Sequence, residues 1–238
     1  MLYTIDNIFT DEQKNNIQRL LTNLQWYDGK KTAAGNAVKG KYSLQCDTSN
    51  GGALFSEFAS NINSILHNNE KFSRHFANGL PFMIHNIRVN RYDEGMKYDW
   101  HVDSPYTKSN GQPVISNYGF VIMIANEFEG GDFELELPNF IDGKKHIKKW
   151  KGNVGDMIIF STHCQHRVKE IISGSRMVVN GWISHSIQND NDLQLLIKLN
   201  NIINYVEENI ENEDKQTTIV ADLTQIKAEL ISRLKTIK

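Results

Sequence analysis

The sequence predicts an α+β protein with a mainly β core, a sandwich or barrel-like double sheet with helices outside it. Short apolar or alternating runs follow one another through residues 82–185, separated by turns that contain glycine or serine. No helical stretch lies between these runs, which disfavours parallel βαβ units. Helical patterns occupy residues 10–78 and return after 186. We therefore expect one domain over residues 1–186, followed by a helical extension over 187–238.

The N-terminal third is expected to hold short strands and helices. Residues 1–9 alternate as a short strand does, and Thr10-Asp11 is typical of a helix start. Residues 42–46 are a second candidate strand, and 54–78 are expected to be helical, with a second short helical piece over 70–76. Both helical segments carry one apolar stripe, formed by Ile17, Leu20, Leu21 and Leu24 in the first and by Leu54, Phe58, Ile62, Ile65 and Leu66 in the second.

Between these helices, residues 29–41 combine glycines and small residues with four lysines. The favoured interpretation is a solvated connection, because such compositions are common in surface loops. The alternative is a mobile flap near a functional site, whose lysines would attract an acidic substrate.

The β core is expected to hold seven strands, two turns and no helix. The turns are residues 126–131 and Gly174-Ser175, and the strands are 82–92, 118–125, 132–137, 147–150, 156–160, 167–172 and 176–183. The C-terminal extension is expected to be a helical hairpin. Its second helix carries an apolar stripe formed by Ile219, Leu223, Ile226, Leu230, Leu234 and Ile237. This hairpin would cover a sheet or form a homodimer surface.

Composition narrows the possible partners and the compartment. Lys+Arg 26 against Asp+Glu 28 leaves a net charge of -2, so no basic excess points to nucleic acid. Only Cys46 and Cys164 are present, which fits a reducing compartment. No signal peptide and no apolar run of membrane-spanning length is recognised, so a cytoplasmic protein with no membrane partner is expected.

The motif that points most directly to a functional site is His101-Val102-Asp103, because both of its outer residues can bind a metal. On a strand, side chains at i and i+2 share a face, so an imidazole and a carboxylate would present two metal ligands together. Three later histidines are candidates for the third ligand: His146, His163 and His166. His146 lies among lysines and is expected to be exposed.

His163 and His166 are three positions apart and would face opposite sides of a strand, so only one of them joins the site easily. The position of Arg176 in the sequence favours His166. A hairpin through Gly174-Ser175 would bring Arg176 back beside His166, where a buried guanidinium could hold the carboxylate of a cosubstrate. The predicted ligands are therefore His101, Asp103 and His166.

From about Trp26 into the C-terminal helices, the chain resembles the Fe(II)- and 2-oxoglutarate-dependent oxygenases. Within them it is similar to the prolyl 4-hydroxylase-like group that includes the PKHD-type hydroxylases. The matching pieces are Arg91-Tyr-x-x-Gly-x-x-Tyr98-x-x-His101-x-Asp103-Ser-Pro, Gly130-Gly131, Gly155-Asp156 leading into Phe160, His166-x-Val168, Arg176 and Trp182.

The resemblance implies a double-stranded β-helix, or jelly roll. It also implies that the three predicted ligands hold Fe(II) and that Arg176 pairs with the distal carboxylate of 2-oxoglutarate. Tyr92 matches a tyrosine that contacts the cosubstrate, and Tyr98 and Trp182 match pocket-lining positions. Met123 stands where related animal prolyl hydroxylases carry a tyrosine that contacts the cosubstrate. Ascorbate is implied as the reductant.

The implied activity is hydroxylation of a C–H bond, chiefly of a prolyl residue in a peptide or protein as in procollagen-proline 4-dioxygenase, with release of succinate and CO2. One alternative is the same chemistry on a small molecule or a methylated nucleic acid. The oxidative repair enzymes carry a further arginine where this chain has Trp182. The other alternative is a non-catalytic cupin-like module with a structural metal, which would have no use for Arg176.

Overall fold

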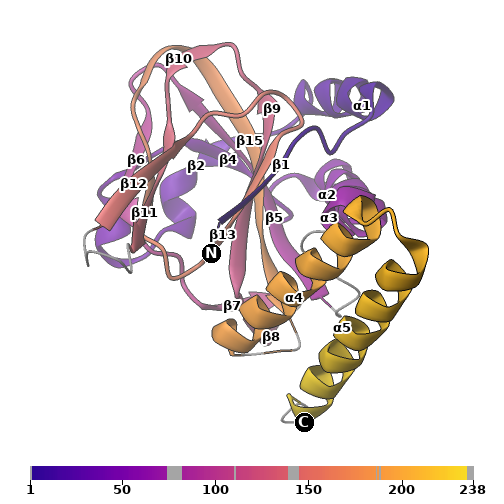
Figure 1. Cartoon of the computed structure of the whole chain (residues 1–238). Helices are drawn as coiled ribbons and strands as arrows, with labels where there is room; N and C mark the ends of the chain where they lie inside the picture. The colour runs from indigo at the N-terminus through magenta and orange to yellow at the C-terminus, as the bar shows by residue number, and fades with distance from the viewer. Residues whose placement is uncertain are drawn as a thin grey trace.

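The fold is built on two antiparallel β-sheets that pack face to face (Figure 1). The structure is a computed structural model, which describes residues 2–73, 82–109, 111–138, 145–185, 187 and 189–234. The larger sheet has the order β1-β13-β9-β15-β5-β4-β2, with β10 paired to β15. Its strands are β1 (Leu2–Ile5), β2 (Tyr27–Asp28), β4 (Leu44–Cys46), β5 (Phe82–Asp93), β9 (Tyr118–Ala125), β10 (Phe128–Gly130), β13 (Met157–Ser161) and β15 (Ile171–His185).

The smaller sheet has the order β12-β11-β14-β6-β3. Its strands are β3 (Lys41–Tyr42), β6 (Lys97–His101), β11 (Phe133–Pro138), β12 (Lys145–Trp150) and β14 (His166–Val168). A separate hairpin, β7 (Tyr106–Ser109) and β8 (Gln112–Ile115), follows the His-x-Asp motif. The two facing sheets form the jelly roll that the resemblance implied.

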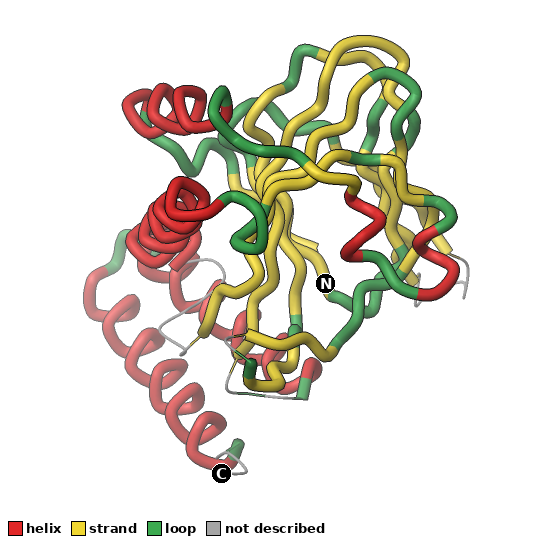
Figure 2. The backbone as a smooth tube through the Cα atoms, turned by 180° about the vertical axis from the view of Figure 1, so that it is seen from behind, coloured by secondary structure: helices red, strands yellow, loops and turns green. Residues whose placement is uncertain are grey.

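The helices lie on the outer face of the larger sheet, away from the smaller sheet (Figures 1 and 2). They are α1 (Asp11–Leu21), α2 (Gly52–Asn68), α3 (Glu70–Phe72), α4 (Asp190–Asn209) and α5 (Glu213–Arg233). Thr10 caps α1 as predicted, in a reciprocal pair with Gln13. Apolar side chains of the helices, such as Phe55 and Phe58 of α2, pack with Val89 in one core cluster.

A second apolar cluster fills the space between the two sheets. It contains Val121 and Val178 from the larger sheet and Leu135 and Val168 from the smaller one. Alternate residues of β9 therefore face the two clusters, with Val121 in the second cluster and Ile122 in the first. The continuous apolar run 118–125 follows from burial on both faces of this strand.

The predicted C-terminal helical hairpin is present. Leu193, Leu196 and Ile197 of α4 are buried in the core cluster beneath the helices, so this helix covers the sheet. The residues of α5 are less covered, with Ile219 38% and Ile226 53% exposed. Ile237, the last residue of the predicted stripe, lies outside the described residues.

The expected turn at Gly174-Ser175 is wrong, because β15 runs through it without a break. Gly174 has a φ of 78°, and its missing Cβ allows the close approach of the Glu127 backbone beside β10. The expected strand 167–172 is instead divided between β14 and the start of β15, which belong to opposite sheets. The expected turn 126–131 contains β10.

The expected helical region 54–78 is present as α2 and, for the short second piece expected over 70–76, as α3, and the part at 74–78 lies outside the described residues. The hairpin β7–β8 was not predicted. Among the helices that the structure describes, none is both long and apolar enough to cross a membrane.

Candidate metal centre and cavity

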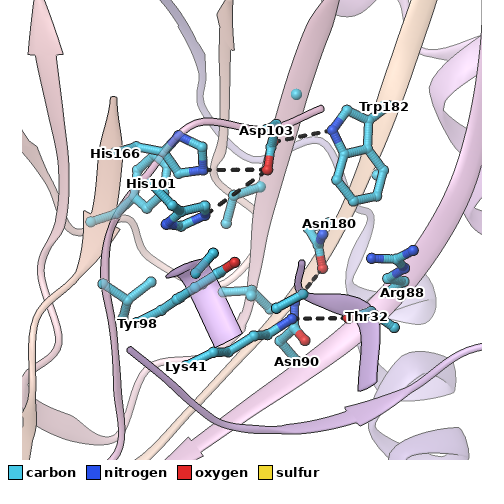
Figure 3. A pocket seen from close by; sticks show the side chains of 18 of the residues that line it. Thr32, Lys41, Arg88, Asn90, Tyr98, His101, Asp103, His166, Asn180 and Trp182 are labelled. Atoms are coloured by element: carbon cyan, nitrogen blue, oxygen red, sulfur yellow. Dashed lines mark hydrogen bonds and ion pairs between the residues drawn. The ribbon is translucent and has the colours of Figure 1, made fainter. Parts of the chain in front are cut away.

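A cavity of about 300 Å³ lies between the two sheets. Figure 3 shows many of the side chains that line it, including Tyr98, His101, Asp103, His166 and Trp182. Its floor is formed by β5 and β15 of the larger sheet. Alternate residues of these strands line the cavity. They are Arg88, Asn90 and Tyr92 on β5 and Arg176, Val178, Asn180 and Trp182 on β15.

The two predicted histidine ligands face each other across neighbouring strands of the smaller sheet. His166 of β14 is the register partner of His101 of β6, and their ring centroids lie 4.1 Å apart. Nδ1 of His101 lies 2.8 Å from the Asp99 carbonyl oxygen, and Nδ1 of His166 lies 3.0 Å from that of Cys164. Each Nδ1 therefore carries the proton and donates it to a carbonyl, which leaves Nε2 as a metal ligand.

Asp103 completes the set from a loop. It lies beyond the end of β6 at His101, so the expectation that both residues share one strand is wrong. Its Oδ1 lies 3.9 Å from Nε2 of His101 and 3.8 Å from Nε2 of His166, and the three ligand atoms lie within 4.8 Å of one another. Trp182 Nε1 donates to Oδ2 over 3.1 Å, which orients the carboxylate. Two imidazoles and one carboxylate match the donor set of non-haem Fe(II) oxygenases.

The surroundings of His101 favour its neutral form. Burial and the neighbouring His166 lower the pKa of His101 to about 2. Tyr98 stacks on His101 with ring centroids 3.6 Å apart, and Phe160 packs on His166 with ring centroids 4.8 Å apart. A neutral imidazole held by an aromatic ring can bind a divalent cation without first losing a proton.

Arg176 supplies the cation expected beside this set, but it reaches the cavity from the opposite sheet. It lies on β15 opposite Tyr92 of β5, so no hairpin with β14 brings it there. It is 1% exposed, and neither its Nε nor its Nη2 has a hydrogen-bond partner among the described residues. Burial lowers its pKa to about 10, so it remains charged at neutral pH. A buried guanidinium with unsatisfied donors fits a carboxylate ligand.

The remaining candidates lie in different places. His163 is exposed in the turn between β13 and β14, and His146 is exposed on β12. Cys164 is buried and serves the centre through its carbonyl oxygen. Met123 is fully buried in the cluster between the sheets and does not line the cavity, whereas Val121 of the same strand does.

The segment 29–41 lines the cavity, so its interpretation as a solvated connection is wrong. It forms two short 3-10 turns, η1 (Gly29–Thr32) and η2 (Gly35–Val38), and places Thr32 and Lys41 at the cavity. Reasoning from the sequence also missed Arg88 and Asn90. They precede Tyr92 by four and two positions within an expected strand, and this alternation was the signal that could have found them.

Comparisons with known proteins agree with this geometry. A family model described as the 2OG-Fe(II) oxygenase superfamily matches residues 87–184. A PKHD-type hydroxylase of Prochlorococcus marinus is 30% identical over 206 residues, which cover 84% of this chain and 85% of that protein. A PKHD-type hydroxylase of Gloeothece citriformis is 23% identical and covers 84% of this chain and 85% of its own length.

Solved structures share the fold. A 2OG-Fe(II) oxygenase family oxidoreductase from Burkholderia pseudomallei superposes with a TM-score of 0.58 at 18% identity, covering 77% of this chain and 84% of that one. A prolyl hydroxylase from Trichoplax adhaerens, solved in complex with a hypoxia inducible factor peptide fragment, has a TM-score of 0.51 at 14% identity, covering 82% and 86%.

Proposed function

The chain belongs to the 2OG-Fe(II) oxygenase superfamily, and we propose that it hydroxylates a C–H bond of a prolyl residue in a peptide or protein. The family implies Fe(II) as the metal and 2-oxoglutarate as the cosubstrate. The proposed reaction consumes O2 and 2-oxoglutarate and releases succinate and CO2 with the hydroxylated product.

One observation carries the proposal. The fully buried Arg176 lines a cavity that also holds two imidazoles and a carboxylate at metal-binding spacing, and two of its guanidinium nitrogens have no hydrogen-bond partner among the described residues. A structural metal alone would leave this guanidinium without a hydrogen-bond acceptor, whereas the carboxylate of a cosubstrate would accept charge-assisted hydrogen bonds from it.

The residues divide the work between holding the metal and positioning the cosubstrate. His101, Asp103 and His166 would hold Fe(II), and Arg176 would bind the distal carboxylate of 2-oxoglutarate. When bound, the iron and cosubstrate supply the oxidising chemistry that the protein side chains lack. Trp182 holds the carboxylate of Asp103 in place through its indole N–H. Apolar side chains around His166, such as Phe133 and Phe160, keep water from this side of the centre.

The prolyl substrate is proposed by analogy. The named relatives are PKHD-type hydroxylases, and one protein of the same fold is described as a prolyl hydroxylase in complex with a peptide fragment.

We further propose ascorbate as the reductant. Both cysteines are buried and neither forms a disulfide within the part of the chain that the structure describes, which supports a reducing and hence cytoplasmic compartment. The exposed Ile219 and Ile226 of α5 support a homodimer through the C-terminal hairpin.

The test is turnover by the purified protein. With Fe(II), ascorbate and 2-oxoglutarate, we expect succinate to form and oxidised residues (+16 Da) to appear in added cell-protein extract, predominantly at proline. The Asp103→Ala variant should form neither, whereas Arg91→Gln, on the same strand as Tyr92 but outside the cavity, should behave as wild type. An iron-loaded protein that turns over no 2-oxoglutarate would instead support the metal-binding module. Formaldehyde release from methylated oligonucleotides would favour nucleic acid as the substrate.

A further inference from the structure

Two more cations, Arg88 and Lys41, line the cavity away from Arg176. On the floor of the cavity, Arg176 pairs across the sheet with Tyr92, and Arg88 pairs with Asn180. These two rungs are four residues apart along β5, or about 13 Å at the usual rise of a strand. The backbone of Arg88 therefore lies at the other end of the floor from Arg176. Its side chain lies beside Trp182 and Asn180 (Figure 3).

The guanidinium of Arg88 is incompletely paired. Its Cζ lies 4.9 Å from the ring centroid of Trp182, and its Nε is 4.0 Å from Oδ2 of Asp47, which is beyond hydrogen-bond distance. The oxygens of Asp47 already accept hydrogen bonds from Tyr27, Gln45 and Ser49. Among the residues that the structure describes, none accepts a hydrogen bond from the Arg88 guanidinium.

Lys41 is also held without a carboxylate. Its side chain extends from β3 of the smaller sheet, and its Nζ donates to Thr32 Oγ1 over 3.0 Å and to Gln45 Oε1 over 3.2 Å. Both acceptors are neutral, and the residue is only 5% exposed. Burial, together with the positive charge of Arg88, lowers the pKa of Lys41 to about 8. Two like charges thus face one cavity, each with unused capacity for an anion.

We propose that Arg88 and Lys41 form an anion subsite that binds a carboxylate of the substrate, so that the substrate is an acidic peptide. The inference rests on the proposed function, since it takes the cavity to be the place where the substrate is hydroxylated. A carboxylate between the two cations gains charge-assisted hydrogen bonds and relieves their repulsion. A neutral substrate at the same place would shield Arg88 from water without giving its guanidinium a hydrogen bond, and it would leave Lys41 with neutral acceptors alone. The subsite therefore selects for charge next to the reacting residue.

The first test measures anion binding without turnover. The protein is loaded with 2-oxoglutarate and with Zn(II), which has no redox chemistry, and its tryptophan indoles are labelled with ¹⁵N. The Trp182 indole resonance, assigned from a Trp182→Phe variant, reports on the guanidinium that stacks on it. Titration with acetate should shift this resonance to saturation, whereas the neutral isostere acetamide should not. We expect Arg88→Gln and Lys41→Met each to weaken acetate binding at least tenfold.

Matched variants separate these two cations from others nearby. Arg91→Gln lies on the same strand as Arg88, and Lys39→Met lies in the same segment as Lys41, but neither residue lines the cavity. Both should bind acetate as wild type does. An acetate shift that is absent, or that survives in both Arg88→Gln and Lys41→Met, overturns the subsite. So does a tenfold loss of 2-oxoglutarate affinity in Arg88→Gln, because that residue would then belong to the cosubstrate. Failure of the wild-type protein to bind 2-oxoglutarate would contradict the proposed function but not the anion subsite.

The second test identifies where the carboxylate comes from. Peptides that the enzyme hydroxylates are compared in pairs, with Asp against Asn or Glu against Gln at each flanking position, and with a free against an amidated C-terminus. For at least one of these pairs, we expect the KM of the neutral peptide to be at least tenfold higher than that of the charged peptide, with a smaller effect on kcat. The Arg88→Gln variant should abolish this preference. Equal KM values for every charged and neutral pair would overturn the proposal.

Discussion

Replacement of Arg176 by methionine should change cosubstrate binding far more than metal binding. Methionine keeps a long, flexible, apolar side chain but removes the guanidinium, whose Nε and Nη2 find no hydrogen-bond partner in the part of the chain that the structure describes. A hydrogen bond to a charged group contributes about 1.5–3 kcal/mol, so two of them to one carboxylate contribute about 3–6 kcal/mol. At 1.4 kcal/mol per tenfold, the Kd for 2-oxoglutarate should rise about 10²- to 10⁴-fold.

The same substitution should not destabilise the ligand-free protein. Burial lowers the pKa of Arg176 from 12.5 to about 10, which corresponds to about 3 kcal/mol of cost for the charged form in the folded state. Methionine removes that cost while it retains most of the packing against Tyr92. Apolar replacement of buried charges is often neutral or stabilising. We therefore expect the free energy of unfolding without ligand to stay the same or to increase.

Two measurements on the same preparations test this reasoning. Calorimetric titration of 2-oxoglutarate into Mn(II)-loaded protein without O2 gives the Kd, and chemical denaturation of the ligand-free protein gives its stability. Metal affinity, measured separately, should be unchanged because Arg176 is not one of the three ligand residues. A Kd within threefold of wild type would refute the assignment of Arg176 to the cosubstrate. A ligand-free variant that is less stable by about 2 kcal/mol or more would show that the guanidinium is already satisfied in the fold.

Three further predictions test the rest of the cavity. Trp182→Phe removes the indole donor to Asp103 and should lower metal affinity about 10- to 100-fold, measured by competition with a chelator. His166→Ala should abolish metal binding in the same assay and His163→Ala should retain it, and the reverse result would show that the third ligand is wrongly assigned. Lys41 has a folded pKa of about 8 against a reference of 10.5, so between these values the unfolded chain binds more protons and stability rises with pH. From pH 7 to 9.5 wild type should therefore gain about 2 kcal/mol relative to Lys41→Met in denaturant titrations, and equal slopes would contradict this burial of the charged lysine.

The sequence was sufficient to predict which residues the structure brings together in the candidate metal centre, but not the geometry that unites them. Asp103 was expected beside His101 on one strand, yet it lies in the following loop and is positioned by Trp182 from the opposite sheet. Arg176 was expected to return by a hairpin, yet it approaches from the opposite sheet. Residue type and spacing indicate which chemistry is present, whereas the pairing of strands decides from which side each group comes.

The anion subsite was beyond reach of the sequence for a related reason. Arg88 and Lys41 are far apart in the chain and belong to different sheets, and polar residues in a strand or a lysine-rich loop are usually exposed to solvent. Their proximity depends on the register of β4 against β5 and of β3 against β6, which places Gln45 beside Asn90 and Lys41 beside Tyr98. Such long-range registers leave no local pattern of composition or periodicity.

The charges around the cavity give an independent reason to expect an anionic substrate. With Fe(II) and dianionic 2-oxoglutarate bound, the charges of the metal, the cosubstrate, Asp103 and Arg176 sum to zero. The other two cations, Arg88 and Lys41, share the carboxylate of Asp47. Asp28 also raises the pKa of Lys41, but it is exposed, so water screens its charge. Lys41 is protonated at pH 7 with a pKa of about 8. One positive charge remains in a place with little access to water, where it interacts more strongly than it would in solution. A single substrate carboxylate would neutralise it, and a neutral substrate would enclose it further, so the discrimination between the two should be largest when the metal and cosubstrate are already bound.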